Sequence, residues 1–378
     1  MDKMHASKLV KAMFFLFFML PQPASADLNS ELNARKTINP FMTWYNNKFS
    51  EKKYGLFFSA QPPTSSRSIT LNSIQWNMFY PDAPWDYLPG VERFIIDKDW
   101  QHAAEYGKTL QLDHTAKGFS DFIGNSSKSR VSKSQSDGVF LDFWFNGHPE
   151  KSFSPSEVKK SRKLIVESIR DQLGEDKIIM GNVAWNKDSD TVSMINGVFL
   201  ELVKPSNKKN QVYTAGDLKK IESLLDYYER KLRHPKIIAL NGWRATSVSD
   251  QAGGDQWNND RNTPENRRMA KILTAMSVVV PTNGYILYSD SNHDSAKSDH
   301  GHIYYDFYKF DIGKPVSKAK IVTAGVRLKA HERGFIAYNI SRRPKKIEYR
   351  SGESIEIEAM GGLFCQYLND GLDCLSYD

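Results

Sequence analysis

Short runs of consecutive apolar residues recur along the chain and alternate with stretches of helical periodicity. Runs that are apolar at nearly every position are typical of strands buried on both faces. Eight runs have this character: YGLFFSA (54–60), SIQWNMFY (73–80), ERFIID (92–97), GVFLDF (138–143), KIIMGNVAW (177–185), NGVFLELV (196–203), KIIALNGW (236–243) and GYILYSD (284–290). Eight strands alternating with helices predict an α/β fold, a (β/α)8 TIM barrel over residues 27–310.

The helical signals are clearest in the second half of the chain. Helices are predicted over residues 154–174, 214–234 and 263–280. The first opens with a serine cap followed by Glu157, and the third opens with Thr263 and Pro264, both common helix starts. A doubly wound or flavodoxin-like sheet is the competing architecture. No Gly-rich phosphate loop follows any of the strands, which weakens that alternative.

The last part of the chain has a different pattern of apolar and polar residues. From residue 311 onward, short runs alternate apolar and charged residues, as in KKIEYR (345–350) and SIEIEA (354–359). This pattern predicts a small antiparallel, β-sandwich-like domain over residues 311–378. Its two cysteines, Cys365 and Cys374, flank an Asn-Asp-Gly turn and predict a disulfide in an exported protein. Two reduced structural thiols are the alternative.

The N-terminus has the features of a secretion signal. Lys8 and Lys11 precede the apolar run AMFFLFFML, and Ala24-Ser25-Ala26 fits an A-x-A cleavage site. We therefore expect residues 1–26 to be a cleaved signal peptide and the protein to be periplasmic or extracellular. An uncleaved membrane anchor is the alternative. No later run is long and apolar enough to span a bilayer, so no stable membrane insertion is expected after cleavage.

The charge of the chain is mildly basic and excludes little. The formal net charge is +7 at pH 7, and it becomes +5 when Lys3, Lys8, Lys11 and Asp2 leave with the signal. A mildly basic protein suits binding to a weakly anionic glycan or envelope surface. Basic residues of this kind usually just form a solvated face of the protein. The basic residues are scattered and no nucleic-acid-binding signature is present, so nucleic acid is not an expected partner.

Two acids stand at the ends of matching strand-like runs. Asp142 and Glu201 each follow the sequence Gly-Val-Phe-Leu. In a TIM barrel the active site lies at the C-terminal ends of the strands, so both side chains are expected to face one pocket. A carboxylate pair suits glycoside hydrolysis, provided that the environment keeps one of the two protonated. The alternative is that each acid caps a helix or pairs with a lysine.

Other residues near the predicted strand ends suit sugar binding. Indole rings stack on the C–H faces of sugars, although core packing also explains tryptophans at such positions. The candidates for stacking or for binding sugar hydroxyls are Trp144, Trp185, Trp243, Asn182, Asp97, Arg244 and Asp290.

The segment after the last predicted strand, residues 289–302, contains His293, His300 and His302. Histidine and aspartate are suitable metal ligands, and a metal-dependent hydrolase is one hypothesis. The spacing matches no known ligand pattern, so a polar loop over the pocket is the preferred interpretation. No metal and no cofactor are expected.

The sequence also resembles a known family. DGVFLDFW followed by NGVFLELV, with the later FDIGKPV and GVRLKAHERGFIAYNIS, resembles the glycosyl hydrolases called hypothetical family 15 and the related endo-α-1,4-polygalactosaminidases and exopolysaccharide hydrolases. The resemblance implies a barrel followed by a β domain, with Asp142 and Glu201 as the catalytic carboxylates. The sequence departs from the family at Phe143 and Trp144, and at Asn196, where relatives usually carry Asp.

Together these observations predict an exported glycoside hydrolase. Its expected substrate is a bacterial exopolysaccharide or another envelope glycan, with amino sugars as one candidate component. Glu201 is the expected general acid/base, and Asp142 the nucleophile or electrostatic partner. The alternative is a non-catalytic glycan-binding barrel that serves polysaccharide secretion or assembly. The sequence gives no sign of the oligomeric state.

Overall fold

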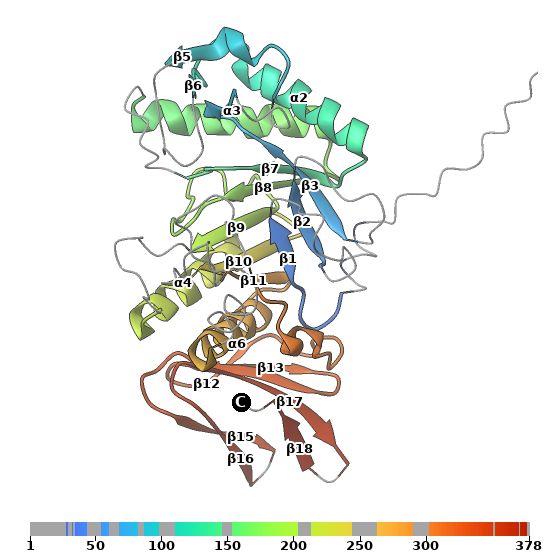
Figure 1. Ribbon diagram of the computed structural model, residues 1–378, viewed down its shortest axis with the longest axis vertical. Helices are drawn as coiled ribbons and strands as arrows, with labels where there is room; N and C mark the ends of the chain where they lie inside the picture. The colour runs from blue at the N-terminus through green and yellow to red at the C-terminus, as the bar shows by residue number, and fades with distance from the viewer. Residues whose placement is uncertain are drawn as a thin grey trace, which may run out of the picture.

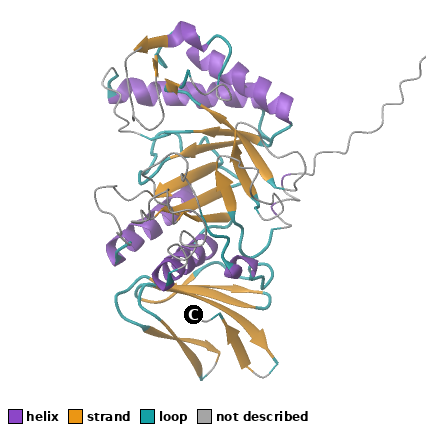
Figure 2. Ribbon diagram, viewed as in Figure 1, coloured by secondary structure: helices purple, strands orange, loops and turns teal. Residues whose placement is uncertain are grey.

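The computed structural model shows three layers along the long axis of the molecule (Figures 1 and 2). Helices α2 (Phe119–Ser134) and α3 (Pro155–Leu173) lie at one end, a β-barrel occupies the middle, and two antiparallel sheets lie at the other end. The structure describes Leu28, Leu32 and residues 35–43, 54–59, 68–81, 87–97, 110–145, 153–202, 213–243, 263–289, 302–350, 352–369 and 371–375.

Eight parallel strands form the barrel, which confirms the predicted (β/α)8 fold class. In spatial order they are β1 (Phe41–Thr43), β2 (Leu56–Ser59), β3 (Ile69–Ile74), β7 (Gly138–Leu141), β8 (Ile178–Asn182), β9 (Gly197–Leu202), β10 (Ile237–Trp243) and β11 (Gly284–Ser289). The sheet closes between its first and last strands, where Pro40 forms a parallel bridge with Ile286.

Of the first three strand predictions, 54–60 is confirmed as β2, and the other two were wrong in part. The run 73–80 covers only the end of β3 and then β4 (Met78–Phe79). The run 92–97 forms a 3-10 helix, η2 (Val91–Phe94), and β5 (Ile95–Asp97), and β5 pairs with β6 (Leu110–Leu112) in a separate three-stranded sheet. Since β5 is outside the barrel, Asp97 does not end a barrel strand. The barrel instead uses β1, a three-residue strand too short to give a periodic signal.

The barrel interior is filled by one apolar cluster. Its members are Phe41, Leu56, Phe58, Ile69, Leu71, Phe140, Ile178, Met180, Phe199, Ile237, Ala239, Tyr285 and Leu287. On each strand with two members, these lie two residues apart, because successive strand side chains point to opposite faces. Phe58 and Phe140 stack in this cluster with their ring centroids 4.5 Å apart. Burial of these large side chains from water holds the strands at a fixed register.

The predicted helices are present with their predicted starts. They are α3 (Pro155–Leu173), α4 (Ala215–Lys231) and α6 (Pro264–Val279). Ser154 and Glu157 form a reciprocal capping box before α3, and the Thr263 side chain accepts a hydrogen bond at the start of α6. A further helix, α2 (Phe119–Ser134), was not predicted. Its sequence is rich in serine, a residue that competes with the backbone for hydrogen bonds in a helix interior.

Helix α6 lies between the barrel and the C-terminal sheets (Figure 1). It contacts β10 and β11 on one side and β13, β14 and β17 on the other. A helix enclosed in this way is buried all round. This enclosure explains why even the charged Lys271 is only 2% exposed.

The C-terminal region is antiparallel, as expected. One sheet contains β12 (Lys320–Thr323), β13 (Val326–His331), β14 (Gly334–Asn339), β17 (Gly361–Leu368) and β18 (Gly371–Cys374), and the other contains β15 (Lys345–Arg350) and β16 (Glu353–Ile357). Cys365 lies opposite Cys374 in the β17–β18 hairpin, and the two form the predicted disulfide.

The proposed signal peptide, residues 1–26, lies outside the described residues. Among the helices that the structure describes, none is long and apolar enough to cross a membrane.

A buried lysine joins the C-terminal sheet to α6 and provides a test of this packing. The Lys329 ammonium donates to the carbonyls of Val278 and Pro281, each at 2.7 Å. Burial lowers the pKa of Lys329 from 10.5 to about 8. Because the unfolded chain then binds more protons between these two values, the stability linked to Lys329 rises with pH in that window and is lost as pH falls through about 8.

The stability of wild type relative to Lys329→Met is therefore expected to rise by about 1–3 kcal/mol between pH 8 and pH 10.5. Urea unfolding at several pH values measures this difference. The exposed Lys346 of β15 is the matched control, and Lys346→Met should show no such trend. A difference between wild type and Lys329→Met that is constant with pH would contradict the buried, proton-linked contact.

Candidate active site

A layer of polar side chains covers the apolar interior of the barrel at the C-terminal ends of its strands. Each of these residues lies two positions after an inward-facing apolar residue, so it points to the same interior. The layer consists of Thr43, Ser73, Asp142, Asn182, Glu201, Asn241 and Ser289. All are buried except Glu201, which is half-buried. This is the end at which TIM-barrel enzymes carry their active sites.

The two predicted carboxylates come together through Asn182. The Asn182 side-chain amide donates to Asp142 Oδ1 at 2.9 Å and to Glu201 Oε2 at 2.7 Å. The three residues come from neighbouring strands, because β8 lies between β7 and β9. Leu141 is the register partner of Gly181, so the residues that follow, Asp142 and Asn182, lie at the same height. One nitrogen thus holds both carboxylates at a fixed separation.

The backbone at Asp142 is held by its neighbours. The Trp76 indole Nε1 donates to the Asp142 carbonyl at 2.8 Å. The Asp142 carboxylate also accepts the backbone N–H of Phe143 at 2.9 Å. Phe143 itself has a φ of 48°, and Ala184, two residues after Asn182, has a φ of 46°. Left-handed backbone at non-glycine residues is costly and concentrates at functional sites.

Trp144 does not line this layer, which corrects its expected role in sugar stacking. The left-handed turn at Phe143 reverses the chain, so the indole packs outside the barrel against Gly181, where an added Cβ would lie 2.6 Å from Trp144 Cδ1. The side chain is 0% exposed, and its ring lies 4.9 Å from that of Trp76. No face of the ring is open to a sugar, and Trp144 is a core residue.

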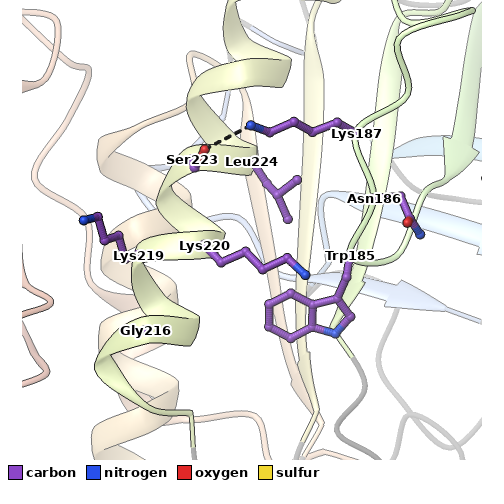
Figure 3. A pocket seen from close by; sticks show the side chains of 8 residues that line it. All are labelled: Trp185, Asn186, Lys187, Gly216, Lys219, Lys220, Ser223 and Leu224. Atoms are coloured by element: carbon purple, nitrogen blue, oxygen red, sulfur yellow. Dashed lines mark hydrogen bonds between the residues drawn. The ribbon is translucent and has the colours of Figure 1, made fainter.

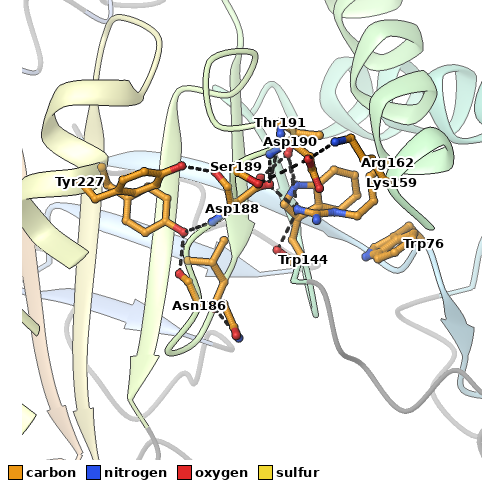
Figure 4. Close-up of polar contacts among 12 residues, drawn as sticks. Trp76, Trp144, Lys159, Arg162, Asn186, Asp188, Ser189, Asp190, Thr191 and Tyr227 are labelled. Atoms are coloured by element: carbon orange, nitrogen blue, oxygen red, sulfur yellow. Dashed lines mark hydrogen bonds and ion pairs between the residues drawn. The ribbon is translucent and has the colours of Figure 1, made fainter. Parts of the chain in front are cut away.

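Around Trp144 lies a buried ion pair (Figure 4). Arg162 of α3 lies 3.0 Å from Asp188, and their side chains are 0% and 1% exposed. The guanidinium also lies over the Trp144 ring at 4.6 Å and donates to the Trp144 carbonyl at 3.2 Å. Thr191 accepts the indole N–H at 2.9 Å and donates its hydroxyl to Asp188. Through these interactions, the segment after β7, which holds Trp144, is connected to the segment after β8, which holds Asp188 and Thr191.

Burial lowers the pKa of the Arg162 guanidinium below its ordinary value, and the neighbouring Asp188 opposes this change. Asp188 is further stabilised by the backbone N–H groups of Asp190 and Thr191, at 3.0 and 3.1 Å. The positive charge of Arg162 and the negative charge of Asp188 therefore compensate each other, and both side chains are buried. Such a pair is costly to break, because the remaining charge is left buried and unpaired.

Trp185 lies on the rim, three residues after Asn182 in the chain. It is half-buried and lines an open groove of about 580 Å³ together with residues of α4 (Figure 3). The Lys220 ammonium lies over its ring at 4.9 Å. Its exposure is consistent with the expected sugar-stacking role, which remains a prediction.

The other expected binding residues lie wholly or partly outside the described residues, so their roles stay predictions. Trp243 ends β10 opposite Ser289, but its side chain is outside the described residues, as are the Asp97 side chain and all of Arg244 and Asp290. Of His293, His300 and His302, only His302 is described. Its Nε2 forms a hydrogen bond with the Tyr54 hydroxyl at 2.8 Å. Within the described part of the chain, no three His, Cys, Asp or Glu side chains gather as a metal site.

The sequence reasoning missed most of the polar layer. Asn241 is the register partner of Glu201, and its amide donates to Ser289 Oγ at 3.1 Å. Within the described residues, Asn241 Oδ1, Ser73 Oγ and Thr43 Oγ1 are buried without a hydrogen-bond partner. Buried polar atoms are normally paired, so these three atoms are exceptions to the usual pattern. The sequence did contain a signal for these residues. Each one lies two positions after an apolar residue that points into the barrel.

Comparisons with known proteins give only distant similarity. No family model matches the sequence, and no curated protein matches it at a significant level. The glycoside hydrolase domain of PelA from Pseudomonas aeruginosa is similar in structure, with a TM-score of 0.44 and 11% identity over 70% of this chain and 97% of that chain. Ega3 from Aspergillus fumigatus, solved with galactosamine, gives a TM-score of 0.41 and 8% identity over 61% and 87%.

Amy13B from Eubacterium rectale gives a TM-score of 0.49 and 11% identity over 90% of this chain and 92% of that chain. Similarity at this level carries no argument about what the chain binds or cleaves. The resemblance to hypothetical glycosyl hydrolase family 15 stays a prediction. The function of this chain is therefore argued from its own residues.

Proposed function

We propose that this chain is an exported glycoside hydrolase that cleaves a bacterial exopolysaccharide or another envelope glycan. The observation that carries the proposal is the Asp142–Asn182–Glu201 arrangement, in which one amide holds two carboxylates at the C-terminal end of the barrel. Paired carboxylates flanking a scissile bond are the usual machinery of glycoside hydrolysis. The chemistry requires no cofactor.

In this proposal Glu201 is the general acid and Asp142 the nucleophile. Glu201 protonates the glycosidic oxygen as the bond to the leaving sugar breaks. Asp142 attacks the anomeric carbon, or stabilises the positive charge that develops there. In the second step Glu201 removes a proton from water as the water oxygen attacks the anomeric carbon, and the bond between that carbon and Asp142 breaks, which releases the product sugar. The half-exposed position of Glu201 suits a group that must exchange protons with solvent, and the greater burial of Asp142 suits a nucleophile.

The spacing of the pair favours retention of anomeric configuration. The bonded oxygens of Asp142 and Glu201 are no farther apart than the two hydrogen bonds of Asn182, 2.9 and 2.7 Å, placed end to end. Retaining enzymes hold their carboxyl groups about 5–5.5 Å apart, whereas inverting enzymes leave about 6.5–9.5 Å for a water molecule. We expect the first product to keep the configuration of the substrate.

A non-catalytic glycan-binding barrel is the second candidate, favoured by the half-buried Trp185, which lines an open groove. Binding and cleavage measured on one panel separate the two. Wild type is incubated with bacterial exopolysaccharides, and both retention on the glycan and release of reducing ends are followed. Release of reducing ends supports the hydrolase. Retention without release across the panel supports the binding barrel.

The bridging amide gives a residue-specific prediction. Asn182→Leu keeps the volume but removes the donor, so we expect kcat to fall about 10- to 100-fold. The acidic limb of the pH–rate profile should also move to higher pH, because the ionised carboxylate loses a hydrogen bond that stabilises it. Asn182→Asp should not restore activity, because it adds a third negative charge. A normal rate and profile in Asn182→Leu would show that the bridge has no catalytic role.

A further inference from the structure

The groove beside Trp185 is formed by segments that continue from the strands of the carboxylate pair. One wall is the segment after β8, the strand that ends at Asn182, and contributes Trp185, Asn186 and Lys187. The other wall is the N-terminal half of α4, which follows β9, the strand of Glu201. Its volume of about 580 Å³ lies within the roughly 300–1,000 Å³ of small-molecule sites. Both walls therefore follow the C-terminal ends of barrel strands, the end at which the carboxylate pair lies.

All charged residues that the structure places in the groove lining are basic. Among the described residues, the groove lining includes Lys187, Lys219 and Lys220 and no acidic residue. None of the three lysines forms an ion pair within the described residues. The carboxylate at the start of α4, Asp217, is occupied in capping Thr214. The neighbouring acids of α4, Glu222 and Asp226, bind Arg327 instead.

The groove also offers a flat aromatic surface. Figure 3 shows Trp185 and the Lys220 side chain facing each other across the groove, while Lys187 reaches Ser223. The Lys187 ammonium lies 3.2 Å from Ser223 Oγ and over the Tyr227 ring at 5.5 Å. An indole ring next to an ammonium group is suited to a ligand that has both an apolar C–H face and a negative charge.

We propose that this groove is a subsite for a carboxylate-bearing sugar, such as a uronate, in the glycan substrate. This inference rests on the proposed function and narrows its substrate from envelope glycans in general to acidic ones. The sugar ring stacks on Trp185, and its carboxylate pairs with Lys220 and Lys187. A free amino sugar is protonated at neutral pH, so the same lysines repel it. A polycationic galactosamine polymer is therefore disfavoured as the substrate.

The test is a binding measurement on the Glu201→Gln background, which prevents turnover. The probes are oligogalacturonate, a neutral malto-oligosaccharide, a de-N-acetylated chito-oligosaccharide and inorganic tripolyphosphate. We expect oligogalacturonate to bind most tightly, with an affinity that decreases as salt increases. Lys187→Gln with Lys220→Gln should weaken oligogalacturonate binding about five- to twentyfold and leave the neutral sugar unchanged. Trp185→Ala should weaken both sugars but not tripolyphosphate.

The matched control replaces two exposed lysines outside the groove, Lys160 of α3 and Lys231 at the far end of α4, with Gln. It makes the same change in net charge and should leave binding unchanged. Equal losses in both double variants, or preferred binding of the cationic chito-oligosaccharide, would overturn the inference. Tripolyphosphate binding as tight as oligogalacturonate would also overturn it, because the site would then recognise charge without the sugar.

The outcome also separates this inference from the proposed function. Groove-dependent binding of oligogalacturonate by a wild type that releases no reducing ends would reject the hydrolase and keep the acidic subsite. Cleavage of glycans by a wild type whose binding does not depend on the groove lysines would keep the hydrolase and reject the subsite.

Discussion

Glu201→Gln and Asp142→Asn are each expected to lower kcat/KM for glycan hydrolysis at least about a hundredfold, because positioned acid–base groups typically contribute 10²–10⁴-fold. Both replacements keep an oxygen that accepts the Asn182 hydrogen bond, so the arrangement of the site should survive. Reducing-end release under saturating and subsaturating glycan measures the loss. Affinity for the glycan should change little, since the groups removed act mainly in the transition state.

The matched control is Asp137→Asn at the opposite end of the same strand. Asp137 precedes β7 and its carboxylate accepts the Thr70 backbone N–H at 2.8 Å, so it is a half-buried acid of the barrel that lies away from the proposed site. This variant should keep its kcat even if its stability falls. If it lost activity as Glu201→Gln does, the effect would come from the fold rather than from the carboxylate pair. Unchanged activity in both site variants would reject the assignment.

Much of the fold could be predicted because buried parallel strands have a strong apolar signature. The runs around Phe140, Phe199 and Ile238 gave their strands within a few residues, and the caps at Ser154 and Thr263 gave helix starts. The predicted number of eight strands was right through two compensating errors. The short β1 was missed, and 92–97 was counted although β5 belongs to a side sheet. A local pattern shows that a strand is buried but not which sheet buries it.

The candidate site could be predicted only where a side chain follows the regular alternation of a strand. Asp142, Asn182 and Glu201 do, and the structure brings them together. Trp144 does not, because the left-handed conformation of Phe143 turns the chain out of the barrel. No sequence rule marks a phenylalanine for that conformation, which most residues other than glycine avoid. The burial of the indole under Arg162 therefore required the structure.

The network around Trp144 gives the second large expected effect, on stability. Arg162→Met removes the cation but leaves Asp188, 1% exposed, with an unpaired buried charge. We expect the free energy of unfolding to fall by about 3–5 kcal/mol, as in other broken buried pairs. Urea unfolding measures this loss. Catalytic activity of the folded fraction should fall as well, because the network fastens the segments that begin at Asp142 and Asn182.

Lys159 provides the control, because it lies one turn from Arg162 on α3 and pairs with Asp190 at 2.8 Å. Its side chain is 51% exposed, so Lys159→Met should cost no more than about 1 kcal/mol. The double variant Arg162→Met with Asp188→Leu removes both buried charges and should recover part of the stability lost in the single variant. Equal losses in Lys159→Met and Arg162→Met would mean that burial does not strengthen this pair. A double variant less stable than Arg162→Met would show that the remaining Asp188 charge is not the source of the loss, and that its hydrogen bonds to Asp190 and Thr191 matter more.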